Sequence, residues 1–269
     1  TIYSRDAFLQ RYRGRHPFFD FPGAGPEMIS IDLLHVVDNN GVASHVIANL
    51  FYEAIMQREL GNHNKEEGLQ QLNARIKTFY SQNQVAAHLP TLSMQNLIDE
   101  RHPTTVFPVL HGKAIKAANT RGIIPFAAEL AAQLDNGTPK RHHRARCVVE
   151  LNRFYQTVHA AGMFPTAEQS DAIRSSVGKC LKHYCWLAKD AVKAGKMAYN
   201  IVPKMHYFFH IGLRSRFTNP RFGQTYINES MVGRVCSIYK ASMSGTGDHK
   251  VQQKSVLIKY PTGLIVSFT

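Results

Sequence analysis

Apolar residues recur at helical spacing through the middle of the chain. One stripe follows Gly41, with Glu53 and Arg58 lying off it, and its members are Val42, Val46, Ile47, Leu50, Phe51 and Ala54. Steps of three and four residues are typical of an amphipathic helix with one buried side. The same kind of pattern predicts helices near residues 65–80, 147–160 and 167–195. Shorter helices are expected around 91–98 and 106–130, the latter region including one opened by Pro125.

Strand-like patterns occur only toward the two ends. Residues 28–37, MISIDLLHVV, form an apolar run that predicts a strand or a strand-to-helix junction buried on both faces. Residues 254–259 and 264–268 are two further candidate strands. Residues 1–30 contain the turn cluster FPGAGPE and are expected to be irregular. The expected fold class is therefore mostly α with a few terminal β-strands.

The chain carries a large positive charge. Its 269 residues include 32 Lys and Arg but 19 Asp and Glu, which gives a net charge of +13. Such an excess attracts DNA, RNA or anionic lipid, although a basic enzyme could also carry it. No run of about 18 apolar residues is present, so a membrane span is not expected. The chain begins at Thr1 without a visible secretory signal, as a processed precursor or an excised fragment would.

Familiar enzyme and metal motifs are missing. There is no G-x-S-x-G, P-loop or Gly-rich dinucleotide motif. The four cysteines form no CxxC pair, and the spacing of Cys180 and Cys185 is unusual for zinc, so reduced core thiols are expected. The 14 histidines leave a mixed Cys/His site conceivable. Because the familiar motifs are missing and the cysteine spacing does not suit zinc, we predict no metal and no other cofactor.

Two short motifs contain histidine. Asp32-x-x-His35 is either a pair of metal-capable side chains or a half-buried Asp that caps the following helix. His206-x-x-x-His210 would place both imidazoles on one side of a helix, at a spacing that suits a metal ion. The intervening residues of this second motif are apolar, so two hydrogen-bonded core histidines are the favoured interpretation.

Glu229 is the single acidic residue in the basic and aromatic segment 204–240. It belongs to the pattern Tyr226-x-x-Glu229-x-x-x-Gly233 and would lie in the first turn of a helix beginning near Asn228. Acidic residues are favourable there in any case, so a surface Glu that interacts with the helix dipole is one explanation. A metal-binding carboxylate is the other.

Two segments favour nucleic-acid binding. KRHHRAR at 140–146 is a basic run, and residues 214–223 alternate Arg with Phe, which suits phosphate contacts combined with base stacking. A charge run is usually a solvated face, but two of them make a binding surface more credible. The predicted nucleic-acid-binding residues are Lys140, Arg141, Arg144, Arg146, Arg214, Arg216, Phe217, Arg221, Phe222, Arg234 and Lys240.

The order of these motifs resembles the C-terminal half of DDE transposases of the CACTA and Plavaka-like group. The likeness rests on Asp32-x-x-His35, on Pro203-Lys204-x-His206-x-x-x-His210, on Asn219-Pro220-Arg221-Phe222 and on Glu229, and covers about residues 16–60 and 200–260. The resemblance implies an RNase H-like core interrupted by a helical insertion. The partial core would comprise 1–40 and 200–269, and the insertion 41–199. Asp32 and His35 would match the family's D-x-x-H element, and Glu229 its last catalytic acid.

The chain departs from the family in its acidic residues. The family needs two earlier aspartates, whereas Asp6 and Asp20 lie in irregular sequence. Two-metal phosphoryl transfer requires carboxylates around ions about 3.5–4 Å apart. Under this resemblance Asp32, His35 and Glu229 would be relics of a catalytic site, and Mg²⁺ would be expected only in an active transposase.

Three functions remain open. The first is a catalytically incomplete, transposase-derived domain that binds RNA or DNA, for example as a structural subunit of a large ribonucleoprotein such as a mitochondrial ribosome. The second is the C-terminal part of an active, nuclear DDE transposase. The third is a protein-interaction subunit of an organellar complex without nucleic acid.

Overall fold

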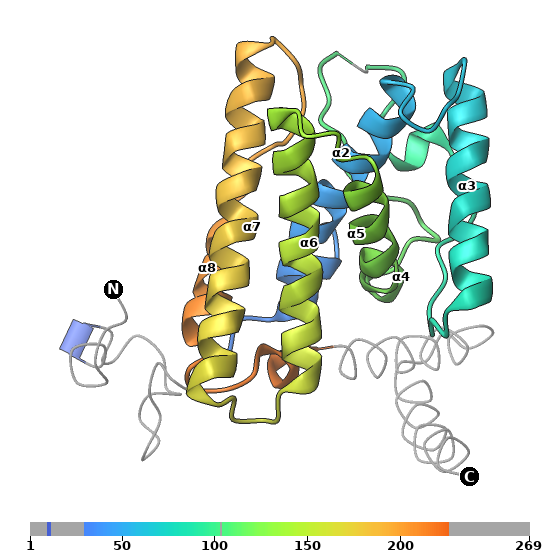
Figure 1. Ribbon diagram of the computed structural model, residues 1–269. Coiled ribbons are helices and arrows are strands. Elements are labelled where there is room, and N and C mark those ends of the chain that lie inside the picture. Colours follow the sequence, from blue (N-terminus) through green and yellow to red (C-terminus); the bar gives the residue numbers. More distant parts are fainter. Residues whose placement is uncertain (1–9, 12–29, 103, 226–269) are drawn as a thin grey trace, which may run out of the picture. The chain divides into compact units, whose positions relative to one another are not determined.

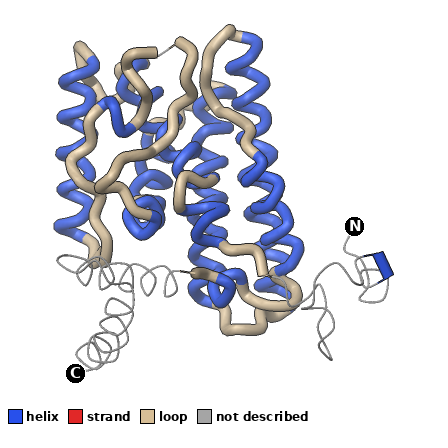
Figure 2. Tube along the Cα trace, turned by 180° about the vertical axis from the view of Figure 1, so that it is seen from behind, coloured by secondary structure: helices blue, strands red, loops and turns tan. Residues whose placement is uncertain are grey.

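The computed structural model describes residues 10–11, 30–102 and 104–225, and these residues are predominantly helical (Figure 1). No strand occurs among them (Figure 2). In chain order the main elements are the π-helix η3 (Leu34–Asp38), α2 (Val42–Met56), α3 (Lys65–Gln82), the 3₁₀-helix η4 (Met94–Asn96), α4 (Ala117–Gly122), α5 (Ile124–Gln133), α6 (Pro139–Ala160), α7 (Ala167–Lys193), α8 (Pro203–Arg214) and the 3₁₀-helix η5 (Pro220–Gly223). The mostly helical prediction is confirmed, whereas the candidate strands at 254–259 and 264–268 lie outside the described residues.

The apolar run at 28–37 is helical from Leu33 onward. From Leu34 the chain forms a π-helix, in which the Asn39 N–H donates to the Leu34 carbonyl at 2.8 Å. Leu33, Leu34 and Val37 are completely buried, as the apolar run predicts. No strand precedes the helix within residues 30–33. A strand over the whole run is excluded by this helix, and a short apolar run does not by itself distinguish a buried strand from a buried helix. The strand-to-helix junction stays a prediction, because residues 28–29 lie outside the described part of the chain.

Several helices begin where local chemistry predicts a start. The Asn64 side chain accepts from the Glu67 N–H at 2.8 Å at the start of α3. Thr166 and Gln169 form a reciprocal capping box before α7, with hydrogen bonds of 3.0 and 3.2 Å. Proline occupies the first turn of α5, α6 and α8, where its missing N–H costs nothing. These local signals explain why the helical pattern was readable from the sequence.

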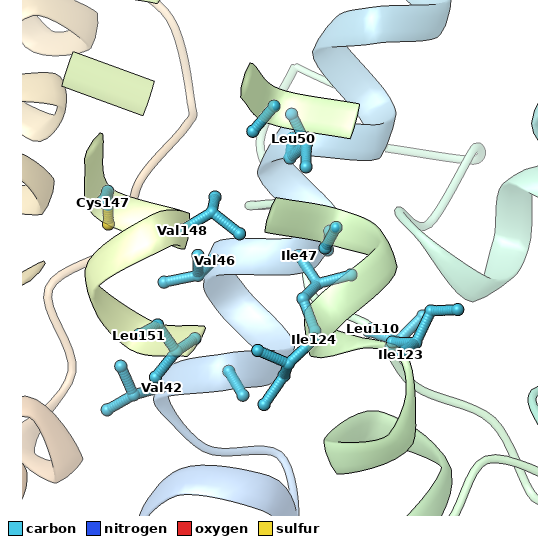
Figure 3. Packing of buried hydrophobic residues seen from close by; sticks show 14 of the residues in the cluster. Val42, Val46, Ile47, Leu50, Leu110, Ile123, Ile124, Cys147, Val148 and Leu151 are labelled. Atoms are coloured by element: carbon cyan, nitrogen blue, oxygen red, sulfur yellow. The ribbon is translucent and has the colours of Figure 1, made fainter. Parts of the chain in front are cut away.

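Helix α2 is buried on almost every side. The six residues of its predicted stripe are at most 3% exposed, and Figure 3 shows Val42, Val46, Ile47 and Leu50 packed among Ile123, Ile124, Val148 and Leu151. Glu53 is also buried, although the pattern placed it off the stripe. Its side of α2 is covered by α6 and by the segment that carries Tyr199. The sequence therefore identified the apolar side of α2 but not the enclosure of its polar side.

Helices α6 and α7 are the two longest described helices and lie side by side in opposite directions (Figures 1 and 2). Helix α5 packs on α6, α8 packs on α7, and α3 packs on α2. A first compact unit extends to Gly223, and the chain from Gln224 onward is a separate unit. Helix α8, which the domain prediction assigned to the partial core at 200–269, packs on α7 within the first unit. The assignment of 41–199 as an insertion stays a prediction.

Candidate nucleic-acid interface

The basic run at 140–146 forms the first two turns of α6, and half of it faces inward. Arg144 lies four residues after Lys140 and three after Arg141, so it neighbours both of them on the helix surface. The Arg144 guanidinium is 2% exposed and pairs with both Glu53 and Glu59. Charged side chains are almost never fully buried unless they are paired, and these ion pairs account for the burial of Arg144.

These residues form a cluster that we call the inner ion cluster: Glu53, Glu59, Lys140, Arg141 and Arg144. Lys140 Nζ lies 2.5 Å from Glu53 Oε1, and Arg141 Nε lies 2.9 Å from Glu59 Oε1. Arg144 Nη1 donates to Glu53 Oε2 at 3.3 Å, and its Nη2 donates to Glu59 Oε2. Two buried carboxylates are thus matched by three cations. That Lys140, Arg141 and Arg144 contact nucleic acid stays a prediction; in this structure Glu53 and Glu59 offset two of their three positive charges.

Tyr199 closes the inner ion cluster. Its hydroxyl donates to Glu53 Oε2 at 2.7 Å, and its backbone N–H donates to the Asn49 side chain at 2.9 Å. Burial raises the pKa of Tyr199 well above its usual value, and the Glu53 charge adds to this effect. Burial alone would lower the pKa of Arg144, but the hydrogen bond to Glu59 and the carboxylate charges outweigh it and raise that pKa. Arg144 is therefore a permanent cation and Tyr199 a permanent donor at neutral pH.

The outer side of α7 carries a second set of cations, which we call the α7 lysine face: Lys179, Lys182, Lys189 and Lys193. All four are exposed, and within the described part of the chain none of them forms an ion pair. Their spacing of 3, 7 and 4 residues places them on one side of the helix. That side is opposite the buried residues Ile173, Val177, Cys180, Tyr184 and Leu187. The face is an uncompensated row of positive charge.

The sequence analysis missed the α7 lysine face. Its lysines are separated by apolar and aromatic residues, so no short window of α7 is strongly basic. The usable signal was the helical spacing of Lys179, Lys182, Lys189 and Lys193 combined with the apolar stripe of the same helix.

Two histidines and Trp186 lie where the α7 lysine face meets α6. His143 Nδ1 is 2.8 Å from His183 Nδ1, and the His143 ring stacks on Trp186 with centroids 4.0 Å apart. Burial lowers the pKa of His183 to about 4, with further lowering from His143 and Arg146. Burial, His142 and Lys182 also lower the pKa of His143. Both imidazoles are therefore uncharged at neutral pH, and the lysines supply the charge of this surface together with Arg146, which is 47% exposed.

The predicted segment 214–223 lies at the end of α8. Asn219 anchors it, because its buried Nδ2 donates to the carbonyls of Val158, Ala161 and Gly162 at 2.9–3.1 Å. Arg216 and Arg221 are exposed, and the Arg216 guanidinium lies 4.4 Å from the centre of the Phe217 ring. Phe222 is 56% exposed.

A pocket of about 200 Å³ opens in the same region, lined by Ser30, Ile31, Met163, Ile211, Arg214, Thr218, Pro220, Phe222 and Gly223. Of the five predicted residues in this segment, Arg214 and Phe222 line the pocket, whereas Arg216, Phe217 and Arg221 are not part of its lining.

The Asp32-x-x-His35 motif lies beside the Lys204 motif. Asp32 Oδ1 accepts from the Leu34 N–H at 3.0 Å, and its Oδ2 contacts His35 Nδ1. The Lys204 ammonium donates to the carbonyls of Asn39 and Asn40 at 2.9 and 3.1 Å, just after η3. Asp32 thus caps the start of η3, as one of the two interpretations of this motif expected. Motifs about 170 residues apart in sequence are adjacent in space.

The remaining predicted residues divide into two groups. His206 and His210 were expected in the core, but His206 is exposed and His210 is half-buried on the outer side of α8. That expectation is wrong because the buried side of α8 is formed by Met205, Phe208, Ile211 and Gly212 instead. Glu229, Arg234 and Lys240 lie outside the described residues.

The described residues offer no closed metal centre. Nowhere between 30 and 225, Pro103 aside, do three or more His, Cys, Asp or Glu side chains gather around a point that could hold an ion. Cys147 and Cys180 are buried thiols with sulfurs 3.8 Å apart, in line with the expected core cysteines.

No helix in the described part of the chain is long and apolar enough to span a membrane.

Comparisons with known proteins add no relative. No protein-family model, no curated protein and no solved structure matches the chain.

Proposed function

We propose that the chain is a nucleic-acid-binding, transposase-derived domain without a complete catalytic centre, which binds phosphate backbones through the α7 lysine face. The single observation that carries this proposal is the row of four exposed lysines without ion pairs in the described residues. The wider context we propose is a large ribonucleoprotein such as an organellar ribosome. The RNase H-like core remains part of this proposal.

The geometry of the α7 lysine face suits a polyanion. Lys179 and Lys193 are 14 residues apart, which corresponds to about 21 Å along a straight helix. Double-stranded DNA carries a negative charge about every 1.7 Å along its axis, so one such stretch of duplex can neutralise all four lysines. Asp190 shares this side of α7 and lowers its formal charge from +4 to +3.

The chemistry of the face favours backbone contacts over base recognition. Lysine ammonium groups are flexible point charges, whereas arginine forms the planar bidentate contacts that read bases. One side of the Trp186 ring is already covered by His143, which limits base stacking there. We therefore expect binding that depends strongly on salt and weakly on sequence.

The acidic residues support a non-catalytic role. Asp38 is completely buried and its carboxylate accepts a hydrogen bond from the Tyr155 hydroxyl. Asp32 is engaged by the Leu34 N–H and by His35. Neither carboxylate is presented in a group that could hold two metal ions, since the described residues contain no such group.

The test compares the full chain with a variant in which Lys179, Lys182, Lys189 and Lys193 are all changed to Gln. For both proteins, the affinity for a fluorescent 30-base-pair DNA and for an RNA of the same sequence is measured between 50 and 200 mM salt. Loss of four phosphate contacts should reduce the slope of log K against log salt by about 3–4 for DNA. Circular dichroism checks that both chains are folded.

A matched control removes the same charge elsewhere. Arg75, Lys77, Lys113 and Lys116 are all exposed outside α7 and are changed together to Gln. This control should keep most of the wild-type salt slope. Salt-independent binding by the wild type, or an equal loss in the control, would overturn the assignment to α7.

A further inference from the structure

Helix α8 presents two imidazoles side by side on its outer surface. His206 and His210 are one turn apart, and their Nε2 atoms are 3.0 Å from each other. Their ring centres are 4.5 Å apart. The opposite side of α8 is held in the core by Met205, Phe208 and Ile211, each at most 4% exposed. The backbone that carries the two rings is thus fixed by packing, while the rings lie on the outer side of α8 with their Nε2 atoms facing each other.

We infer that His206 and His210 form a two-histidine binding site for a divalent transition-metal ion such as Zn²⁺. Zinc–imidazole bonds of about 2.0–2.1 Å at a tetrahedral angle separate two ligand nitrogens by roughly 3.3 Å. The observed Nε2 separation of 3.0 Å needs only a small ring rotation to reach that value. Imidazole is also the side chain that Zn²⁺, Cu²⁺ and Ni²⁺ favour in mixed N/O sites.

The contact between the two rings also suits a metal site. Metal binding requires neutral imidazole, and the two Nε2 atoms already face each other at 3.0 Å. In the metal-free chain one Nε2–H can donate to the other ring, which explains the close approach. Replacing that single shared proton by a metal ion allows both nitrogens to act as ligands.

Two protein ligands leave further coordination positions to water or to oxygen atoms of a bound partner. Such an arrangement corresponds to an open site, not to a closed structural zinc site. The other histidine pair is less suitable, because His143 and His183 approach through Nδ1, the His143 ring is stacked on Trp186, and the pair lies beside Arg146 and Lys182. The α8 pair is therefore the stronger candidate, although the sequence analysis predicted no metal.

The experiment titrates the tag-free full chain at pH 7.5 with ZnCl₂ by calorimetry, and with CoCl₂ by visible absorbance. We expect one ion per chain at this site. Changing His206 or His210 to Ala should weaken binding by more than about tenfold, since even the loss of a residue supporting a ligand costs 10–100-fold. Lowering the pH to 5.5 should also weaken it, because protons then compete for both nitrogens.

A control variant removes two other histidines, His63 and His142, which are both exposed. It should bind Zn²⁺ like the wild type. If the wild type binds no more tightly than the double variant His206→Ala/His210→Ala, the pair is only hydrogen-bonded and the inference fails. The quadruple α7 lysine variant should retain metal binding, so this result is independent of nucleic-acid affinity.

Discussion

The inner ion cluster and the α7 lysine face both contain basic side chains, but those of the cluster are paired with carboxylates and those of α7 are exposed. In the cluster, Lys140, Arg141 and Arg144 neutralise two buried carboxylates. On α7, four lysines project outward with no ion pair in the described part of the chain. The dense basic run in the sequence thus stabilises the fold, whereas the dispersed lysines form the exposed positive surface. Charge density along a sequence is a poor guide to where charge remains available.

The difference follows from what each helix packs against. Helix α6 lies against α2, which brings Glu53 into the interior, and a buried carboxylate is tolerated only with a partner. Helix α7 packs on α6 and α8 through its apolar side, so its lysines remain hydrated. The two regions should therefore respond differently to the same kind of mutation.

The largest effect is expected at Arg144. Changing Arg144 to Ala leaves Glu53 and Glu59 without their shared buried partner, and breaking a buried ion pair costs about 3–5 kcal/mol. Urea denaturation followed by circular dichroism measures the loss. Arg174→Ala is the control, because its pair with Asp171 is exposed and contributes only about 0.2–1 kcal/mol. Equal losses in the two variants would show that the cluster has no special role in stability.

A smaller effect is expected at Tyr199. Changing Tyr199 to Phe removes the hydroxyl that donates to Glu53 at 2.7 Å but keeps the ring that packs edge-on against Tyr184. Loss of a hydrogen bond to a charged group should cost roughly 1.5–3 kcal/mol. Tyr207→Phe, at an exposed ring on α8, serves as the control and should be nearly neutral in the same denaturation assay. A stable Tyr199→Phe chain would mean that Arg144 and Lys140 alone satisfy Glu53.

The sequence predicted most helices because their apolar stripes and caps are local features. The stripe of α2, the capping Thr166 of α7 and Pro125 of α5 all appear where expected. The π-helix at Leu34–Asp38 was not predicted, since five apolar or mixed residues carry no readable period. Glu53 was placed off the buried stripe because burial of its side depends on α6 and Tyr199, which are about 90 and 146 residues away.

The candidate site was predicted only in part for the same reason. Arg216 and Arg221 are exposed near Phe217 and Phe222, as the alternating pattern suggested. Arg144 was assigned to the surface, although its environment is set by carboxylates from α2 and the residues after it. The local sequence predicts on which side of a helix a residue lies. Which other element covers that side is decided by tertiary packing, which the local sequence does not show.

A third prediction concerns the histidines beside the α7 lysine face. The folded-state pKa of His183 is about 4, below the ordinary value of 6.5 expected in the unfolded chain. The unfolded chain therefore binds this proton more readily, and stability should fall as the pH drops from about 6.5 toward 4. Melting temperatures measured across this range should show the decline, and His183→Gln should make it shallower. His63→Gln, at an exposed site, should leave the profile unchanged, and an equal flattening there would refute the assignment to His183.

The smallest effect on stability is expected on the α7 lysine face itself. Lys189 is exposed and makes no ion pair among the described residues, so Lys189→Ala should change the free energy of unfolding by no more than about 0.5 kcal/mol. The same variant should lower the salt slope of DNA binding by about 0.9, because one phosphate contact is lost. Arg144→Ala should behave in the opposite way when measured under conditions where it remains folded, losing stability while keeping the salt slope. If Lys189→Ala lost stability instead, the Lys189 charge would stabilise the folded state as the Arg144 charge does. The contrast between a stabilising charge on α6 and an available charge on α7 would then be refuted.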